Sequence, residues 1–246
     1  MSRFVLTLGC IVLFCVYALT ACSASDLFGN WEGEAAATYA TPSYLGQTGL
    51  IVTPTAMIQP ELKGAIFYHK IQAQPRRQDL YGATIGLPLD LEVSVLRVVN
   101  LEPLTTEAPD VWRQETLLNA KWQVPLGEVI GNPLAPKLAV GVFDVSNLAD
   151  RTWYGAISRS FSLLQDESSL ITLHLGYAKK DHGGGRLDGL FGGFDAQINK
   201  QLVLQAEYDA EDLNGGLRYY PIPSLSLDGS VIGGNFGWGA TTNNAF

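Results

Sequence analysis

The residues most often used for catalysis and metal binding are few and scattered in this chain. Its three histidines, His69, His174 and His182, include no pair four residues apart and have no cysteine nearby, so their spacing does not predict a zinc site. The sequence also lacks the motifs G-x-x-x-x-G-K-[ST], G-x-S-x-G and H-E-x-x-H, which mark phosphate-binding loops, serine hydrolases and zinc hydrolases. We therefore expect no cofactor, no metal site and no enzymatic activity.

One catalytic alternative stays open. Ser158 or Ser160 and His174 lie on the polar faces of two strands that we expect to be neighbours, so a serine hydrolase acting on lipid or glycan could be assembled from them. Serine and histidine on adjacent polar faces are also common inside a barrel. The stretch "DHGGGR", 181–186, resembles an anion-binding turn, although a plain glycine-rich loop explains it better.

The segments that would position these residues are strands. Alternating apolar and polar residues bounded by turn residues predict strands at 48–54, 62–73, 79–88, 90–99, 114–125, 136–147, 151–163, 169–180, 188–199, 201–210, 214–222 and 225–235. No segment combines an apolar period of 3.6 with helix caps and freedom from glycine. We therefore expect an all-β chain, an antiparallel transmembrane β-barrel of about 12 strands (10–12). It would open with 48–54 and end with 225–235, followed by a glycine- and asparagine-rich tail.

The two faces of these strands differ in polarity. In "ITLHLGYAK", 171–179, Leu173 and Leu175 lie on one face, whereas Thr172 and His174 lie on the other. A soluble β-sandwich with its apolar face inward would give the same alternation. Aromatic residues near the expected strand ends, such as Trp153, favour a barrel in lipid with an aromatic girdle. A lipid-anchored soluble β-domain remains the alternative.

The first 21 residues have the composition of a secretory signal peptide. Arg3 is their only charge, and the apolar stretch 4–19 is shorter than the roughly 20 residues that a spanning helix needs. The ending Leu-Thr-Ala-Cys resembles a bacterial lipobox and predicts a lipoprotein anchored at Cys22, with cleavage after Ala24 as the alternative. Residues 22–45, rich in small side chains, would form a flexible tether, and 46–246 a single barrel domain.

Composition narrows the class of partner. All three cysteines lie within the first 22 residues, so the barrel must fold without disulfides. Without residues 1–21 the chain has 24 acidic side chains against 15 basic ones, and no run of five like charges occurs. Such a balance argues against nucleic acid as a partner, because phosphate binding needs clustered Lys and Arg.

Charges on the polar faces predict a network inside the barrel. Glu207 and Asp209 on one expected strand face Arg218 on the next, and facing strands bring such side chains within reach of each other. Lys121, Asp144 and Asp195 could extend the network. Because buried charges must be compensated, we expect these residues to plug or gate a narrow lumen.

Four stretches, in order, resemble the YjbH-type outer-membrane family associated with exopolysaccharide and capsule operons. They are "GQTGLIVTPTAMIQPELKGAIFYHK" (46–70), "LAVGVFDVSN" (138–147), "YGAISRSF" (154–161) and "LQAEYDAEDLNGGLRYYP" (204–221). The residues that carry the motifs are Gly49, Leu50, Ile51, Pro54, Thr55, Ala56, Gly64, Asp144, Glu207, Tyr208, Asp209, Asn214, Gly216 and Tyr219. Each motif alone is weak, and the resemblance rests on their order along nearly the whole chain after the signal.

The resemblance implies a β-barrel, often lipidated, in the outer membrane of a Gram-negative bacterium, with its N-terminus on the periplasmic side. It implies a role in the export, modification or anchoring of a secreted polysaccharide, with outer-membrane lipid and polysaccharide export or assembly proteins as partners. It implies no catalytic residue. Because the family's fuller members are considerably longer, we expect an accessory or structural role for this short chain.

Overall fold

The structure is a computed structural model that describes residues 40–72, 77–101, 112–125, 136–162, 170–182 and 186–243. The expected signal peptide 1–21, the lipidation of Cys22 and most of the tether lie outside the described residues. Among the described residues, no helix has the length and apolar composition needed to cross a membrane.

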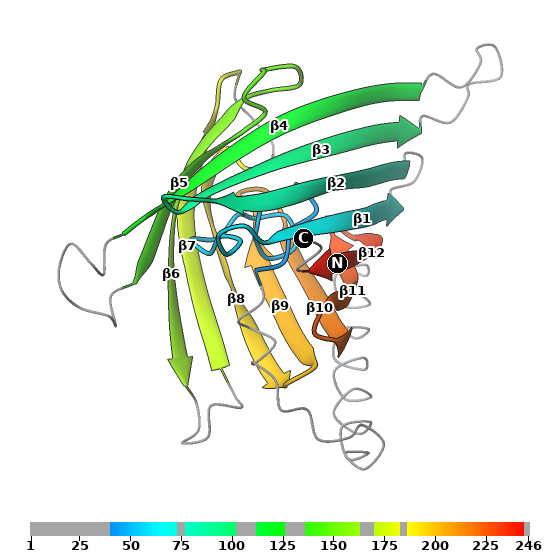
Figure 1. Ribbon diagram of the computed structural model, residues 1–246. Helices are drawn as coiled ribbons and strands as arrows, with labels where there is room; N and C mark the ends of the chain where they lie inside the picture. The colour runs from blue at the N-terminus through cyan, green and yellow to red at the C-terminus, as the bar shows by residue number, and fades with distance from the viewer. Residues whose placement is uncertain are drawn as a thin grey trace. The chain divides into compact units, whose positions relative to one another are not determined.

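Twelve antiparallel strands close into one barrel, as the alternation predicts (Figure 1). The strands are β1 (Gly64–Gln72), β2 (Arg77–Leu87), β3 (Leu91–Leu101), β4 (Trp112–Val124), β5 (Lys137–Phe143), β6 (Thr152–Ser162), β7 (Leu170–Lys180), β8 (Gly189–Asn199), β9 (Leu202–Tyr208), β10 (Leu213–Ile222), β11 (Leu225–Ile232) and β12 (Asn235–Asn243). Each strand pairs with its neighbours in sequence, and β12 pairs with β1 from Ala65 opposite Asn243 to Gln72 opposite Phe236. The sheet therefore closes on itself where the last strand meets the first.

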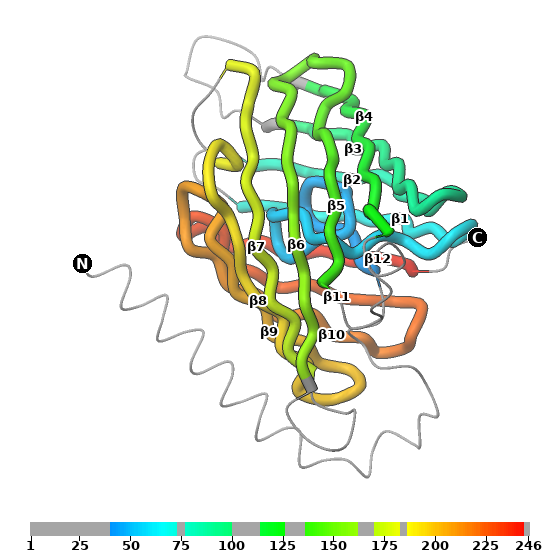
Figure 2. The backbone as a smooth tube through the Cα atoms, turned by 90° about the vertical axis from the view of Figure 1, so that its left-hand side faces the viewer, coloured from blue at the N-terminus to red at the C-terminus, as the bar shows by residue number. Residues whose placement is uncertain are grey.

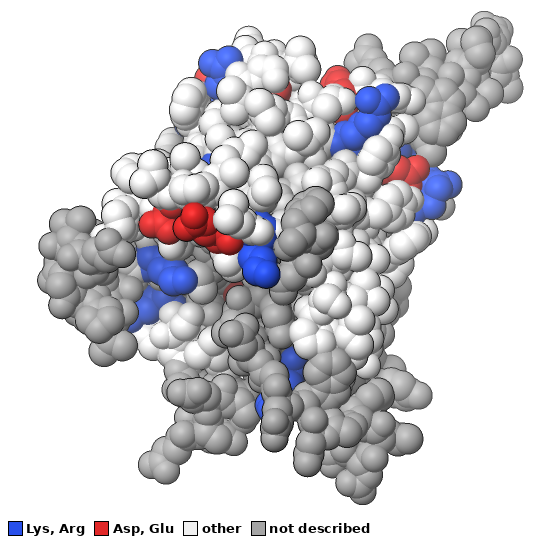
Figure 3. All heavy atoms as spheres, in the orientation of Figure 1, with Lys and Arg blue, Asp and Glu red and all other residues white. Residues whose placement is uncertain are grey.

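The outer surface of the barrel is apolar and its interior is polar. On β7, Leu173 and Leu175 are 50% and 59% exposed, whereas Thr172 and His174, which alternate with them, are 2% and 5% exposed. Figure 3 shows one face of the molecule, on which charged side chains gather in a few patches and uncharged residues cover most of the remaining described surface. A soluble sandwich would bury its leucines, so the outward placement identifies the architecture of membrane barrels.

The first expected strand is wrong. Residues 48–54 form no strand of the wall but run through the interior, where their only pairings are isolated bridges such as Gly49 with Pro54. Leu50, Ile51 and Val52 are at most 2% exposed. These residues are buried on every side, so their apolar run reflects enclosure by the barrel and not membership of its wall.

The expected end of the barrel is also wrong. The segment 235–243, which we expected to be a tail, is β12 and closes the barrel. Phe236 and Trp238 point outward, 52% and 38% exposed, and alternate with glycines and small polar residues that point inward. Because the inward residues are glycines and small polar residues, the segment lacks the alternation of apolar and polar side chains that predicts a strand.

The boundary between tether and barrel differs from expectation too. Thr41, Ser43 and Tyr44, assigned to the tether, are at most 3% exposed. Backbone hydrogen bonds join Ser43 to Gln47 and Tyr44 to Ile51. Residues 40–45 therefore belong to the same enclosed segment as 46–59.

Candidate functional site

Residues 40–59, which we call the plug segment, lie inside the barrel. The segment is the blue part of the chain, enclosed by the strands in both views (Figures 1 and 2). From Thr41 to Ala56 every residue is buried except Leu45, which is partly exposed. The plug segment thus fills the part of the lumen that it crosses, and the side chains that hold it form the candidate site.

Glu207 on β9 holds the turn of the plug segment. Its carboxylate accepts the backbone amides of Ile51, Val52 and Thr53 at 3.0, 2.9 and 3.0 Å. It also accepts the Thr53 hydroxyl at 2.7 Å and the Asn214 side-chain amide at 3.0 Å. Hydrogen bonds to a charged acceptor are stronger than neutral ones, and a buried carboxylate needs several of them.

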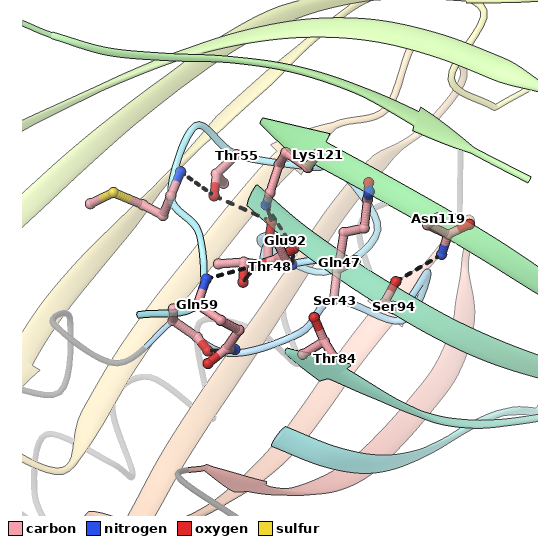
Figure 4. A network of polar contacts seen from close by, with 12 residues as sticks. Ser43, Gln47, Thr48, Thr55, Gln59, Thr84, Glu92, Ser94, Asn119 and Lys121 are labelled. Atoms are coloured by element: carbon pink, nitrogen blue, oxygen red, sulfur yellow. Dashed lines mark hydrogen bonds and ion pairs between the residues drawn. The ribbon is translucent and has the colours of Figure 1, made fainter. Parts of the chain in front are cut away.

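Glu92 on β3 and Lys121 on β4 hold the plug segment from another side (Figure 4). Glu92 accepts the Thr48 amide at 2.9 Å, the Thr48 hydroxyl and the Gln59 amide at 2.8 Å. Lys121 lies 3.1 Å from the Glu92 carboxylate and donates to the Thr48 carbonyl at 2.8 Å. Both side chains are at most 1% exposed, so this ion pair is compensated only by its protein partners.

Arg218 on β10 adds a third contact between wall and plug segment. Its guanidinium donates to Asp228 on β11 at 2.6 Å and to the Leu50 carbonyl at 3.3 Å. The neighbouring Tyr220 hydroxyl lies 2.8 Å from the Thr41 hydroxyl. Side chains from β3, β4, β9 and β10 therefore bind the backbone or hydroxyls of the plug segment.

Ser158, His174 and Asp195 form a hydrogen-bonded chain across β6, β7 and β8. The Ser158 hydroxyl lies 2.8 Å from His174 Nδ1, and His174 Nε2 lies 2.7 Å from the Asp195 carboxylate. The order serine, histidine, aspartate is that of a hydrolase triad, but Ser158 Oγ is buried and accepts the amide of Ala56 at 2.9 Å. In this arrangement the three hydrogen-bonded side chains anchor the plug segment at Ala56.

Apolar and aromatic contacts complete the enclosure. Ile51 and Val52 pack in one buried cluster with Phe67 of β1 and Leu96 of β3. Tyr44 stacks on His69 of β1, with 4.3 Å between the ring centroids. Burial raises the pKa of the Tyr44 phenol, so the ring remains neutral beside the wall.

The expected lumenal network divides into separate contacts. Among the described side chains Arg218 pairs with Asp228, and not with Glu207 or Asp209 as its strand position suggested. Asp209 pairs with Arg186 at 2.7 Å. Glu207 binds the plug segment instead, through the backbone amides of residues 51–53.

Two further expected members lie apart from each other. Asp195 belongs to the chain of Ser158 and His174. Asp144 follows β5 in a turn and accepts the amide of Ala149 at 2.6 Å, while its own amide donates to Asn119. Asp144 therefore stabilises a turn and makes no ion pair with the other predicted members in the described part of the chain.

Sequence reasoning missed Glu92 and Asp228, two of the wall carboxylates. Both lie on strands that were expected, in "LEVSV", 91–95, and "LSLDGSV", 225–231. Alternation along these strands places Glu92 beside Ser94 and Asp228 beside Ser226 on the inward face, where all four are buried. That signal predicts their inward position but not their partners, which are the plug segment for Glu92 and Arg218 for Asp228.

Residues of the first and last family motifs meet inside the barrel. Gly49, Leu50, Ile51, Pro54, Thr55 and Ala56 belong to the plug segment, and Gly64 begins β1. Glu207, from the last motif, binds the turn of the plug segment, and Asn214 of the same motif donates to the Glu207 carboxylate. Tyr208 is 47% exposed on the outer face, and Gly216 lies against Ile51.

A small polar cavity of about 40 Å³ remains between the plug segment and β7 to β10. Thr55 and Met57 line one side, and His174, Asp195 and Gln205 line the other. This volume suits a few water molecules. Among the described residues, no group of three or more His, Cys, Asp or Glu side chains is placed to hold a metal ion.

Comparisons with known proteins give structural similarity only. No protein-family model and no curated protein matches the chain. Among solved structures, the KdgM porin is 11% identical with a TM-score of 0.47, covering 74% of this chain and 99% of that one. The same porin in complex with disordered oligogalacturonate has a TM-score of 0.46 at equal identity and coverage. A triple mutant of the Rh. blastica porin is 9% identical over 74% of this chain and 98% of that one, with a TM-score of 0.28.

Proposed function

We propose that this protein is an outer-membrane β-barrel lipoprotein, closed by its own plug segment, with an accessory or structural role in the export or assembly of a secreted polysaccharide. The observation that carries the proposal is the attachment of the plug segment to the wall through Glu92 and Glu207. A barrel held shut in this way is suited to support or anchor an export machinery, and not to pass a polymer through its own lumen.

The strength of the attachment supports a closed resting state. Glu207 and Glu92 are 1% and 0% exposed, and each accepts three or more hydrogen bonds. Releasing the plug segment would leave both carboxylates without these donors until water replaced them, at a cost of about 1–3 kcal/mol for each unsatisfied group. Thermal motion alone would therefore open the lumen rarely.

The link to polysaccharide rests on the resemblance to the YjbH-type family. The first motif stretch forms the plug turn, and Glu207 of the last motif binds it at Thr53. Residues of the first and last motifs therefore take part in closing the barrel, and this contact supports the proposal. The proposal includes a lipid at Cys22 and an N-terminus on the periplasmic side, near partner proteins of the pathway, as the same resemblance implies.

Deletion of the gene in its own bacterium tests this role. We expect less secreted or surface-attached polysaccharide in the deletion strain, with synthesis inside the cell unchanged, and recovery with the wild-type gene. Neighbouring genes for polysaccharide synthesis and export would agree with this expectation. Unchanged polysaccharide in a strain that lacks the protein would contradict the proposed role, while leaving the closed barrel itself untouched.

A further inference from the structure

The outer surface of the barrel carries an apolar groove that the closed lumen does not explain. It lies across β4 to β7, which stand side by side in Figure 2. Its volume is about 570 Å³, within the range of sites that bind small molecules, about 300–1,000 Å³. Trp122, Val140, Trp153 and Tyr177 line it.

A glycine forms the floor of this groove. Trp122, Val140, Gly155 and Tyr177 are successive partners in one row across the four strands. The three side chains of that row stand out from the surface, 41%, 45% and 55% exposed. A Cβ atom added at Gly155 would meet no atom closer than the Ala139 carbonyl oxygen at 4.0 Å, so the row has an open gap one residue wide.

One end of the apolar groove carries a positively charged side chain, Lys179. Trp153 and Lys179 are partners in the adjoining row, and both line the groove. Lys179 is the penultimate residue of β7, so it lies near a rim of the barrel. Its ammonium binds Asp188 at 2.9 Å, yet 62% of the side chain is exposed. An ammonium has three N–H donors, so donors remain for a second anion.

We propose that the groove binds one membrane lipid. An acyl chain lies over Gly155 between the rings of Trp122 and Trp153, and an anionic phosphate headgroup lies at Lys179. The apolar lining matches the chain, the rim position of Lys179 matches the depth of a headgroup, and the positive charge matches the phosphate. The inference does not depend on the role in polysaccharide export.

Lipid titration of the full-length protein in detergent, followed by native mass spectrometry, tests the site. The probes are phosphatidylglycerol and phosphatidylcholine with the same acyl chains. We expect one phosphatidylglycerol to bind about tenfold more tightly than phosphatidylcholine. Lys179→Gln should remove most of this difference, because it removes the charge and keeps the groove.

Gly155→Leu should weaken the binding of both lipids about tenfold by filling the gap. Gly229→Leu is the matched control, since Gly229 lies on β11 between the inward Asp228 and Ser230, and a Cβ atom added there meets nothing within 4 Å. Heat-modifiable migration on a gel confirms that each variant is folded. Should Gly155→Leu fail to fold, Trp122→Ala takes its place with the same expectation. Equal binding by Gly155→Leu and Gly229→Leu, or no headgroup preference in the wild type, would overturn the proposal.

Discussion

Glu207 accepts both the backbone amide and the hydroxyl of Thr53, at 3.0 and 2.7 Å, across 154 positions of sequence. The contact joins the wall of a twelve-stranded barrel to a segment that precedes its first strand. The sequence predicts Glu207 as a charge in the lumen, and in the structure this carboxylate binds the backbone of the same chain. The plug segment and the barrel are therefore parts of one folding unit.

Removing the Glu207 charge should loosen the plug segment. Glu207→Gln replaces one acceptor oxygen by an amide that faces the N–H groups of residues 51–53, so we expect a loss of about 1–3 kcal/mol in the free energy of unfolding. Limited proteolysis should cut the plug segment faster in the variant. Glu211→Gln, at an exposed turn position, is the control, and equal cleavage of the two variants would argue against the anchor.

The Glu92 and Lys121 pair should show strong coupling. Lys121→Met leaves a buried carboxylate without its cation, and breaking a buried pair in this way costs about 3–5 kcal/mol. The double variant Glu92→Gln with Lys121→Met has no unpaired charge and should be more stable than Lys121→Met alone. Denaturant unfolding of the wild type, both single variants and the double variant measures the coupling. Simple additivity of the two effects would contradict the pairing.

Closure of the barrel depends on a glycine opposite His69. A Cβ atom at Gly239 would lie 1.8 Å from His69 Cδ2, and His69 cannot retreat because it stacks on Tyr44 of the plug segment. Gly239→Ala should therefore destabilise the folded barrel by about 1–3 kcal/mol. Gly229→Ala, where the added atom meets nothing within 4 Å, should fold like the wild type. Heat-modifiable migration gives the folded fraction of each variant.

Ser158 should behave as an anchor and not as a nucleophile. Ser158→Ala deprives the Ala56 amide of its acceptor and should lower stability by about 1–3 kcal/mol, while secretion of polysaccharide persists. Ser160→Ala, next on the same face and bonded to Thr172 at 3.1 Å, is the control. Loss of secretion in a stably folded Ser158→Ala variant would favour hydrolysis instead.

The wall of the barrel could be predicted from sequence because its signal is local. Eleven of the strands follow from alternation and turn residues, as in β7, where Leu173 and His174 fall on opposite faces. The twelfth, β12, was missed because the inward Gly237 and Gly239 make room for Tyr44 and His69. Those contacts depend on residues distant in sequence, so a local pattern cannot show them.

The candidate site could be predicted only in part. The inward positions of Glu207, Arg218 and Lys121 follow from strand period, but their partners do not. Residues 48–54 resemble a strand because enclosure on all sides selects the same apolar residues as a sheet. An apolar run of this kind can pair in the wall or fill the lumen. Which of the two occurs depends on whether inward carboxylates such as Glu207 accept its backbone amides, and only the tertiary structure shows this contact.

Ion conductance across a planar bilayer tests the closed lumen most directly. The purified wild-type barrel should insert without steady conductance steps, because the plug segment fills the lumen. Glu92→Gln combined with Glu207→Gln should produce steps, since both main carboxylate anchors are weakened, and Glu211→Gln should remain silent. Steady open-channel steps in the wild type, equal in size to those of the double variant, would contradict the account.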